Sequence, residues 1–111
     1  MIDIRSAASA IGIFALGLGV RAATWPRVFA GSGFMPPHGA DEFYHLRRIW
    51  YTFLHFPETL SHDPYFNYPV GGEIIMAPGF DLAVAGLAKV LVHTNDQAAV
   101  EVVAAWVPAV L

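Results

Sequence analysis

The chain has 111 residues, of which 56% are hydrophobic and 14% are charged, and its formal net charge at pH 7 is -3. This composition is more apolar than that of an ordinary soluble domain, so part of the surface needs lipid or partner helices to cover it. Six Lys and Arg residues against nine Asp and Glu residues create no basic field, which argues against a nucleic-acid partner, and the absence of Cys excludes disulfides and thiolate metal sites.

The first apolar segment covers residues 7–25, provided that Arg21 reaches toward the membrane interface. At ~1.5 Å per residue this gives about 29 Å of helix, close to the ~30 Å of a bilayer core. We therefore predict a first transmembrane helix within residues 1–25. A cleaved signal peptide is the alternative, because Arg5 precedes a short apolar run, although Arg21 and Thr24 do not suit a small-residue cleavage site.

Residues 26–78 are predicted to form a first external loop, because Pro, Gly, His, charged and aromatic residues replace the apolar run. An amphipathic helix is predicted within this loop at about 42–56, with Asp41 as its N-cap and Pro57 as its end. Its apolar stripe consists of Leu46, Ile49, Trp50 and Phe53. The opposite face carries Asp41, His45, Arg48, Thr52 and His55. Such a helix is expected along a membrane surface or against other helices.

The later part of the loop, residues 63–72, is incompatible with a regular helix. Pro64 and Pro69 restrict their own backbone and that of the residues before them, and the two glycines Gly71 and Gly72 permit a sharp reversal. We predict an ordered loop that is packed by its tyrosines and by its one phenylalanine.

Two further apolar segments follow the loop. Residues 79–93 are predicted as a second transmembrane helix, with Asp81 and Lys89 near its two ends, and residues 98–111 as the start of a third. The third segment stops without a cap, a charged last turn or a polar tail, so we expect the chain to be a fragment or a truncated gene product. These segments predict an all-α membrane protein.

Asp41 is the candidate catalytic and metal-binding residue. The commonest role of Asp at a helix start is that of an N-cap, but a carboxylate at the membrane interface also suits Mn²⁺ or Mg²⁺, which prefer hard oxygen ligands. The two roles are compatible. One carboxylate does not make a divalent site, so further ligands must come from elsewhere.

His45 and Arg48 follow Asp41 on the same helical face. His45, four residues later, could share a metal with Asp41, although packing or hydrogen bonding beside the site is the commoner role for a lone His. Arg48 is a candidate contact for a donor phosphate, because guanidinium and phosphate form charge-assisted forks. Contact with solvent or with lipid head groups is the alternative for both Arg47 and Arg48.

Several motifs occur in a fixed order along nearly the whole chain. They are Gly39-x-Asp41-x-Phe43-Tyr44-His45-x-Arg47, then Asp63-Pro64-Tyr65-Phe66-Asn67-Tyr68-Pro69-x-Gly71-Gly72, then Pro78-x-Phe80-Asp81, and then the run 102–111. In this order they resemble the amino-terminal part of STT3-type oligosaccharyltransferase catalytic subunits of the GT-C superfamily. The bacterial and archaeal single-subunit forms are the most similar.

The resemblance implies a multi-pass protein of the cell or inner membrane, with the loop 26–78 in the periplasm or outside the cell. The family transfers a glycan from a polyprenyl-linked phosphate or diphosphate donor to the Asn of an Asn-x-Ser/Thr acceptor polypeptide. Asp41 matches the family's cation-binding aspartate, so Mn²⁺ or Mg²⁺ would neutralise charge on the leaving phosphate, and Asp41 would also orient the acceptor amide. The family's other acidic and acceptor-binding motifs would lie beyond residue 111, so the chain alone is expected to be inactive.

Two other functions stay open. One is another polyprenyl-phosphate-sugar transferase of the same superfamily, although the run 63–69 favours the oligosaccharyltransferase. The other is a non-catalytic small membrane protein or remnant, for which Gly12, Gly17 and Gly19 are weak packing signals. Counting the arginines of the loop would place it in the cytoplasm, but two of them lie on the predicted helix, where other roles explain them.

Overall fold

The structure is a computed structural model that describes residues 3–29 and 40–111. Its elements are α1 (Ile4–Ala22), α2 (Trp25–Val28), α3 (Ala40–His55), β1 (His62–Asp63), β2 (Gly72–Glu73), α4 (Gly79–Leu91) and α5 (Gln97–Val110). The prediction of a mostly helical chain with a long apolar helix near its amino terminus is confirmed. Residues 30–39 of the predicted external loop, with Gly39 of the first motif, and residues 1–2 lie outside the described residues.

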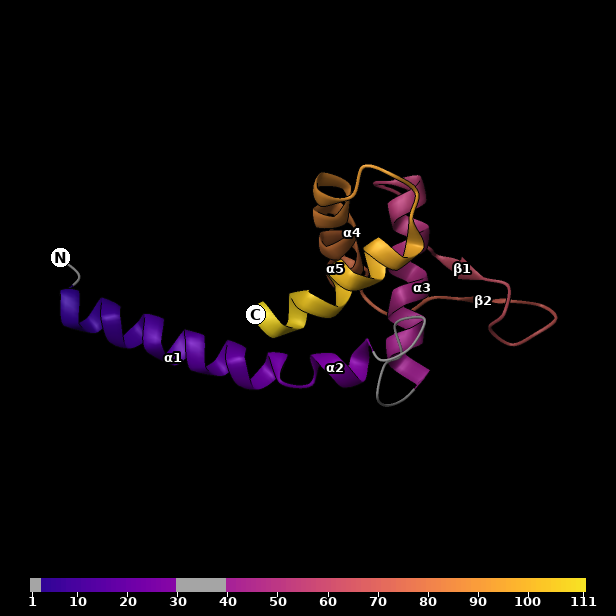
Figure 1. Ribbon diagram of the computed structural model, residues 1–111. Helices are drawn as coiled ribbons and strands as arrows, with labels where there is room; N and C mark the ends of the chain where they lie inside the picture. The colour runs from indigo at the N-terminus through magenta and orange to yellow at the C-terminus, as the bar shows by residue number, and fades with distance from the viewer. Residues whose placement is uncertain (1–2, 30–39) are drawn as a thin grey trace.

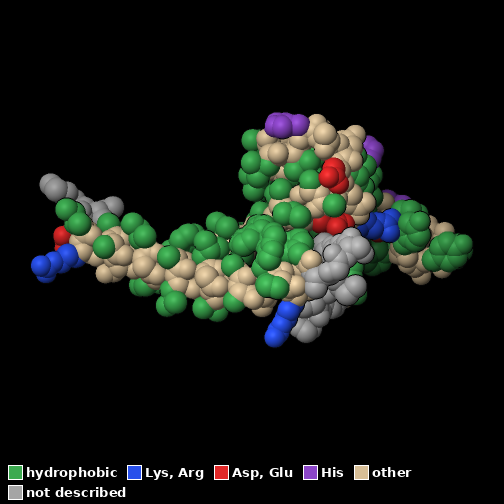
Figure 2. Space-filling model, viewed as in Figure 1, with side chains coloured by type: hydrophobic (Ala, Val, Ile, Leu, Met, Phe, Trp, Pro, Cys, Tyr) green, Lys and Arg blue, Asp and Glu red, His purple; other side chains and the backbone are tan. Residues whose placement is uncertain are grey.

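α1 extends from the rest of the chain as a long arm (Figure 1) and has no buried residue. Hydrophobic side chains lie along the whole of this arm (Figure 2). Within the described residues, Ile4–Val28 is the one helical stretch long and apolar enough to cross a membrane. A signal sequence has the same length, composition and position, so both predictions for this segment stay open.

α4 and α5 occupy the places of the predicted second and third transmembrane helices. With 13 and 14 residues they are about 20 Å and 21 Å long, which is less than the ~30 Å of a hydrocarbon core. α4 also runs beside α3 in a direction different from that of α1 (Figure 1). That either helix crosses a membrane therefore stays a prediction.

A small hydrophobic core joins α3, α4 and α5. Its buried members are Ile49, Phe53, Val84, Ala85, Ala88, Val100 and Ala104. Leu46 and Trp50 border this core, so the apolar stripe predicted for α3 faces it as expected. On α4 the contact surface includes two alanines with no exposed surface, Ala85 and Ala88, and these small side chains let the neighbouring helices approach closely.

The end of α1 contacts α5 through Arg21, and the start of α2 contacts it through the ring of Trp25. Arg21 Nη1 donates to the carbonyl oxygens of Pro108 at 3.4 Å and Ala109 at 3.3 Å. The rings of Trp25 and Trp106 lie 4.7 Å apart. Because the last carbonyls of a helix carry partial negative charge, the guanidinium is electrostatically favoured at this end of α5.

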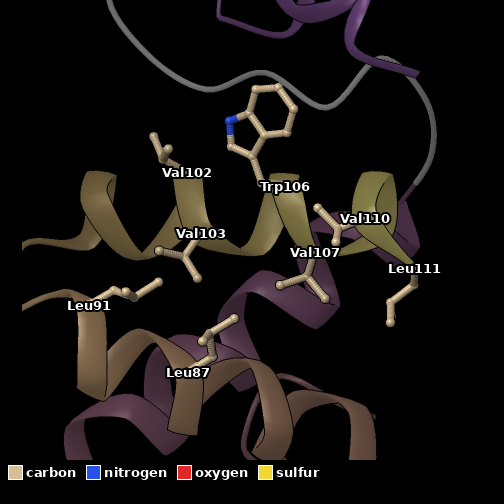
Figure 3. Close-up of a pocket in the computed structure, with 8 residues that line it drawn as sticks. All are labelled: Leu87, Leu91, Val102, Val103, Trp106, Val107, Val110 and Leu111. Carbon is tan, nitrogen blue, oxygen red and sulfur yellow. The ribbon is translucent and has the colours of Figure 1, made fainter. Parts of the chain in front are cut away.

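A groove of about 360 Å³ lies between α4 and α5 (Figure 3). Its lining is entirely apolar and comprises Leu87, Leu91, Val102, Val103, Trp106, Val107, Val110 and Leu111. Apolar surface of this kind is costly in water, so lipid or another helix is the expected environment for this side of the two helices.

Candidate functional site

Asp41 lies in the first turn of α3, which begins one residue earlier at Ala40. The predicted helix at 42–56 therefore starts too late, and Asp41 is inside the helix instead of at its N-cap. Its side chain is exposed, as is that of Glu42 beside it. In this position the carboxylate still interacts favourably with the positive end of the helix dipole.

The described residues offer Asp41 no complete cation site. Among residues 3–29 and 40–111, no group of three or more His, Asp or Glu side chains is placed to hold a metal ion. Mn²⁺ or Mg²⁺ at Asp41 would therefore need ligands from outside this set, since these ions take several oxygen ligands.

His45 contacts Asp81, at the start of α4. Its Nδ1 lies 2.7 Å from Asp81 Oδ1, and 40% of the His45 side chain is exposed against 2% of the Asp81 side chain. A carboxylate can only accept, so Nδ1 carries the proton and donates it. In the neutral imidazole this leaves Nε2 as the basic nitrogen, and no hydrogen bond to it occurs within the described residues.

Arg48 pairs with the other oxygen of the same carboxylate. Its Nε lies 2.8 Å from Asp81 Oδ2, an ion pair without the alignment of a good hydrogen bond, and both side chains are 2% exposed. Arg48 Nη2 also donates to the carbonyl oxygens of Met76 and Ala77, each at 3.4 Å. Arg48 thus fixes the start of α4 against α3. His45, Arg48 and Asp81 are called the α3–α4 polar cluster below.

The polar cluster limits what Arg48 can do for a phosphate. Most of its guanidinium is engaged with Asp81 and the two carbonyls, while Nη1 is buried and has no partner among the described residues. The predicted contact with a donor phosphate stays a prediction, and it would have to use Nη1. Arg48 and Thr52, which lie on the face opposite the apolar stripe, are as buried as Ile49 and Phe53 on the stripe.

Asp81 is the residue of the cluster that sequence reasoning missed. In the sequence it lies near one end of the predicted transmembrane helix 79–93, and no partner is predicted for it. Two signals could have identified it, namely its place in the motif Pro78-x-Phe80-Asp81 and the rule that a carboxylate in an apolar helix needs a compensating charge.

Arg47 points to a second buried carboxylate, that of Asp63. Its Nη2 lies 2.9 Å from Asp63 Oδ1, and its guanidinium carbon lies 4.3 Å from the centre of the Tyr65 ring. Asp63 is 1% exposed and also accepts a hydrogen bond from the backbone N–H of Tyr65 at 2.9 Å. Arg47 therefore connects the loop 63–72 to α3, while 40% of its side chain remains exposed.

The loop 63–72 closes through a short antiparallel pair, in which His62 lies opposite Glu73 and Asp63 opposite Gly72. Phe66 packs edge-on against Tyr44, with ring centres 5.3 Å apart, as predicted. The prediction that the loop tyrosines pack it is wrong, since Tyr65 is 72% and Tyr68 81% exposed. The loop is held instead by Asp63, through its ion pair with Arg47 and the hydrogen bond that it accepts from the backbone N–H of Tyr65.

Tyr44 lies beside the cluster on α3. Its hydroxyl is buried without a hydrogen-bond partner among the described residues, and Arg48 lies 5.7 Å from its ring centre. Burial raises the pKa of Tyr44, and the Arg48 guanidinium opposes this change because it favours the phenolate. The neutral phenol is therefore the form that the folded chain favours.

Comparison of the chain with protein-family models, with curated proteins and with solved structures finds no match. The resemblance to oligosaccharyltransferases thus depends on the motif order alone. To this motif order the structure adds two observations, namely that Asp41 is exposed and that the α3–α4 polar cluster holds the helix on which Asp41 lies.

Proposed function

We propose that this chain is the amino-terminal part of an STT3-type oligosaccharyltransferase of the GT-C superfamily. Such an enzyme moves a glycan from a polyprenyl-linked phosphate or diphosphate donor to the Asn of an Asn-x-Ser/Thr acceptor. The observation that carries the proposal is the exposed carboxylate of Asp41 in the first turn of a helix that is firmly held at its next turns. The order of the motifs supports it.

The anchoring of α3 matters because a catalytic carboxylate has to be held in place. His45 and Arg48, one and two turns after Asp41, contact the buried carboxylate of α4, and Arg47 contacts that of the loop. Ion pairs and core packing on several sides restrict the helix without using Asp41 itself. Rigid support of this kind is what a site needs if it is to place its reacting groups accurately.

Asp41 would hold a divalent cation, Mn²⁺ or Mg²⁺, together with ligands from the rest of the enzyme. A bound cation of this type stabilises negative charge on a leaving phosphate. Asp41 would also accept a hydrogen bond from the acceptor amide and so orient its nitrogen toward the donor sugar. His45 and Arg48 would act near the donor phosphate or behind Asp41.

The proposed location is a cell or inner membrane, crossed several times, with the loop on the outer or periplasmic side. Support comes from the apolar arm Ile4–Val28 and from the uncharged groove between α4 and α5. The two short helices would cross the membrane only as parts of a larger helical assembly, because neither is as long as the hydrocarbon core is thick.

The test uses the gene product extended by any open reading frame that continues past Leu111. Purified protein is given a polyprenyl-linked glycan, Mn²⁺ and a sequon peptide, and glycopeptide is measured by mass spectrometry. We expect Asp41→Asn to lower kcat/KM about 100-fold, or ~2.7 kcal/mol of transition-state stabilisation. Glu42→Gln is the matched control, since Glu42 is the exposed neighbouring acid, and it should retain activity.

Four results would count against the proposal. Equal loss in the two variants would remove any special role of Asp41, and full activity of Asp41→Asn would remove its catalytic role. Sugar transferred to a lipid or small acceptor instead of the peptide would favour the other GT-C transferase. A stop codon directly after Leu111, with no transfer activity, would favour the small membrane protein.

A further inference from the structure

The first two turns of α3 present one carboxylate and one imidazole on the same face. Asp41 and His45 are four residues apart, a spacing that places side chains next to each other along a helix. Asp41 is exposed, and His45 is partly exposed with Nδ1 bound to Asp81. The two groups that are left for a ligand are therefore the Asp41 carboxylate and His45 Nε2.

We propose that His45 Nε2 is a nitrogen ligand of the divalent cation at Asp41, with Asp81 as the positioning residue that fixes the tautomer of the imidazole. The inference rests on the proposed function, because the cation is the same one. It adds a ligand from this chain and predicts which cation the site prefers.

Asp81 supplies what a metal-binding imidazole needs on its far side. A carboxylate that accepts a hydrogen bond from Nδ1–H fixes the tautomer and the orientation of the ring, so that Nε2 is left to face a cation. Asp81 is itself held in place, since it is buried and its other oxygen pairs with Arg48. The His45 ring also lies edge-on to Phe80, with ring centres 5.8 Å apart, so two neighbours restrict its rotation. Little conformational freedom is then lost when a cation binds.

His55 on the same helix shows what a structural role alone would look like. Its Nδ1 lies 2.9 Å from the carbonyl oxygen of Tyr51, so it has the same Nδ1–H tautomer when neutral and an exposed ring. The residue one turn before it is Tyr51, however, and not a carboxylate. His55 therefore matches His45 in helix and tautomer and is more exposed, but it lacks the second ligand.

A nitrogen ligand changes which cation the site favours. Mg²⁺ is bound almost entirely through oxygen and gives up its water reluctantly, whereas imidazole becomes a better ligand along the first-row series that starts with Mn²⁺. With His45 as a ligand, Mn²⁺ should bind more tightly than Mg²⁺. Without it, the remaining carboxylate should discriminate less between the two ions.

The experiment uses the same gene product as the activity test, purified in detergent micelles. Mn²⁺ binding is measured from the electron paramagnetic resonance signal of free Mn²⁺, and Mg²⁺ is added as competitor. Pulsed spectra of bound Mn²⁺ are recorded to detect nitrogen from a coordinated imidazole. We expect His45→Gln to weaken Mn²⁺ binding about tenfold or more, to abolish the nitrogen signal and to reduce the preference for Mn²⁺ over Mg²⁺. The Gln amide can still donate to Asp81, which preserves the link to α4. His55→Gln should change none of these quantities.

Asp41→Asn separates this inference from the proposed function. If Asp41→Asn weakens Mn²⁺ binding while His45→Gln binds Mn²⁺ normally, the nitrogen ligand is overturned and the cation site at Asp41 stands. Absence of the nitrogen signal in the unaltered chain, or an equal effect of His55→Gln, overturns the inference too. Should His45→Gln fail to fold, as judged by circular dichroism, the nitrogen signal and the Mn²⁺ preference of the unaltered chain decide the matter.

Discussion

Asp81 Oδ2 lies 2.8 Å from Arg48 Nε, and both side chains are 2% exposed. The pair joins the first turn of α4 to the middle of α3, beside the hydrophobic core. Each charge is stable there only because the other is present, since an unpaired charge away from water has a large desolvation cost. The ion pair thus specifies how two apolar helices meet.

Removing one charge of this pair should destabilise the chain strongly. We expect Asp81→Leu, or Arg48→Met, to lower the free energy of unfolding by about 3–5 kcal/mol, because each leaves the partner charge buried. The double variant Arg48→Met with Asp81→Leu should recover much of this loss, since neither charge remains. Denaturant unfolding followed by circular dichroism measures all three. A loss below about 1 kcal/mol in both single variants would mean that water reaches the pair.

Asp63 offers a comparison between loss of charge and loss of all polar contact. Asp63→Asn keeps an oxygen for the Tyr65 N–H and removes only the charge facing Arg47, which is 40% exposed and therefore screened by water. We expect a cost of about 0.5–1 kcal/mol for this change. Asp63→Ala removes both contacts and should cost about 1–3 kcal/mol. Amide hydrogen exchange of residues 63–72 measures the difference, and equal exchange in the two variants would contradict it.

Gly71 is the position in the loop where a side chain is least tolerated. Its φ is +80°, and a Cβ there would meet the His62 ring and approach the Asp63 carbonyl oxygen to 3.3 Å. We expect Gly71→Ala to lower stability by at least about 1 kcal/mol. Gly79→Ala is the control, because Gly79 starts α4 and has no atom within 4 Å of a Cβ, so it should be neutral or stabilising. Melting temperatures in the opposite order would refute the assigned strain.

The helices of this chain could be predicted from sequence because their signals are local. The apolar stripe of α3 repeats at three and four residues, and Pro57 follows the end of the helix at His55. The boundary at Asp41 was missed by only one or two residues, since several residue types are acceptable at a helix start. The length and apolar character of α1 could be predicted from the local sequence in the same way.

The pairing of the polar residues could not be predicted in the same way. His45 and Asp81 are 36 residues apart, and nothing in the local sequence of either helix indicates the other. Their contact depends on how α3 packs against α4, which buries Arg48 and Thr52 on a face that looks solvent-exposed by composition. Local patterns indicate that a helix has a polar face, whereas the tertiary packing decides which polar residues are buried.

Tyr44 should make the stability of the fold sensitive to alkaline pH. Burial raises the pKa of Tyr44 above its ordinary value of 10.0. As the pH rises, the unfolded chain therefore loses this proton before the folded chain does. The stabilisation is complete below pH 10 and is lost as the pH rises through the higher pKa of the folded state. A side-chain hydrogen bond with Glu58 raises the pKa of Tyr51 as well, which adds a change of the same sign.

Tyr44→Phe separates these contributions. The variant removes a buried hydroxyl that has no partner among the described residues, so its stability at neutral pH should equal or exceed that of the unaltered chain. Its free energy of unfolding should then fall less steeply from about pH 9 to about pH 11. Tyr51→Phe should remove only the part of this pH dependence that comes from Tyr51. The double variant should show the smallest change in the free energy of unfolding over this pH range. If Tyr44→Phe instead kept the full slope, the Tyr44 hydroxyl would have to be as accessible to water in the folded chain as in the unfolded one, and the packing of Tyr44 between Arg48 and Phe66 would be wrong.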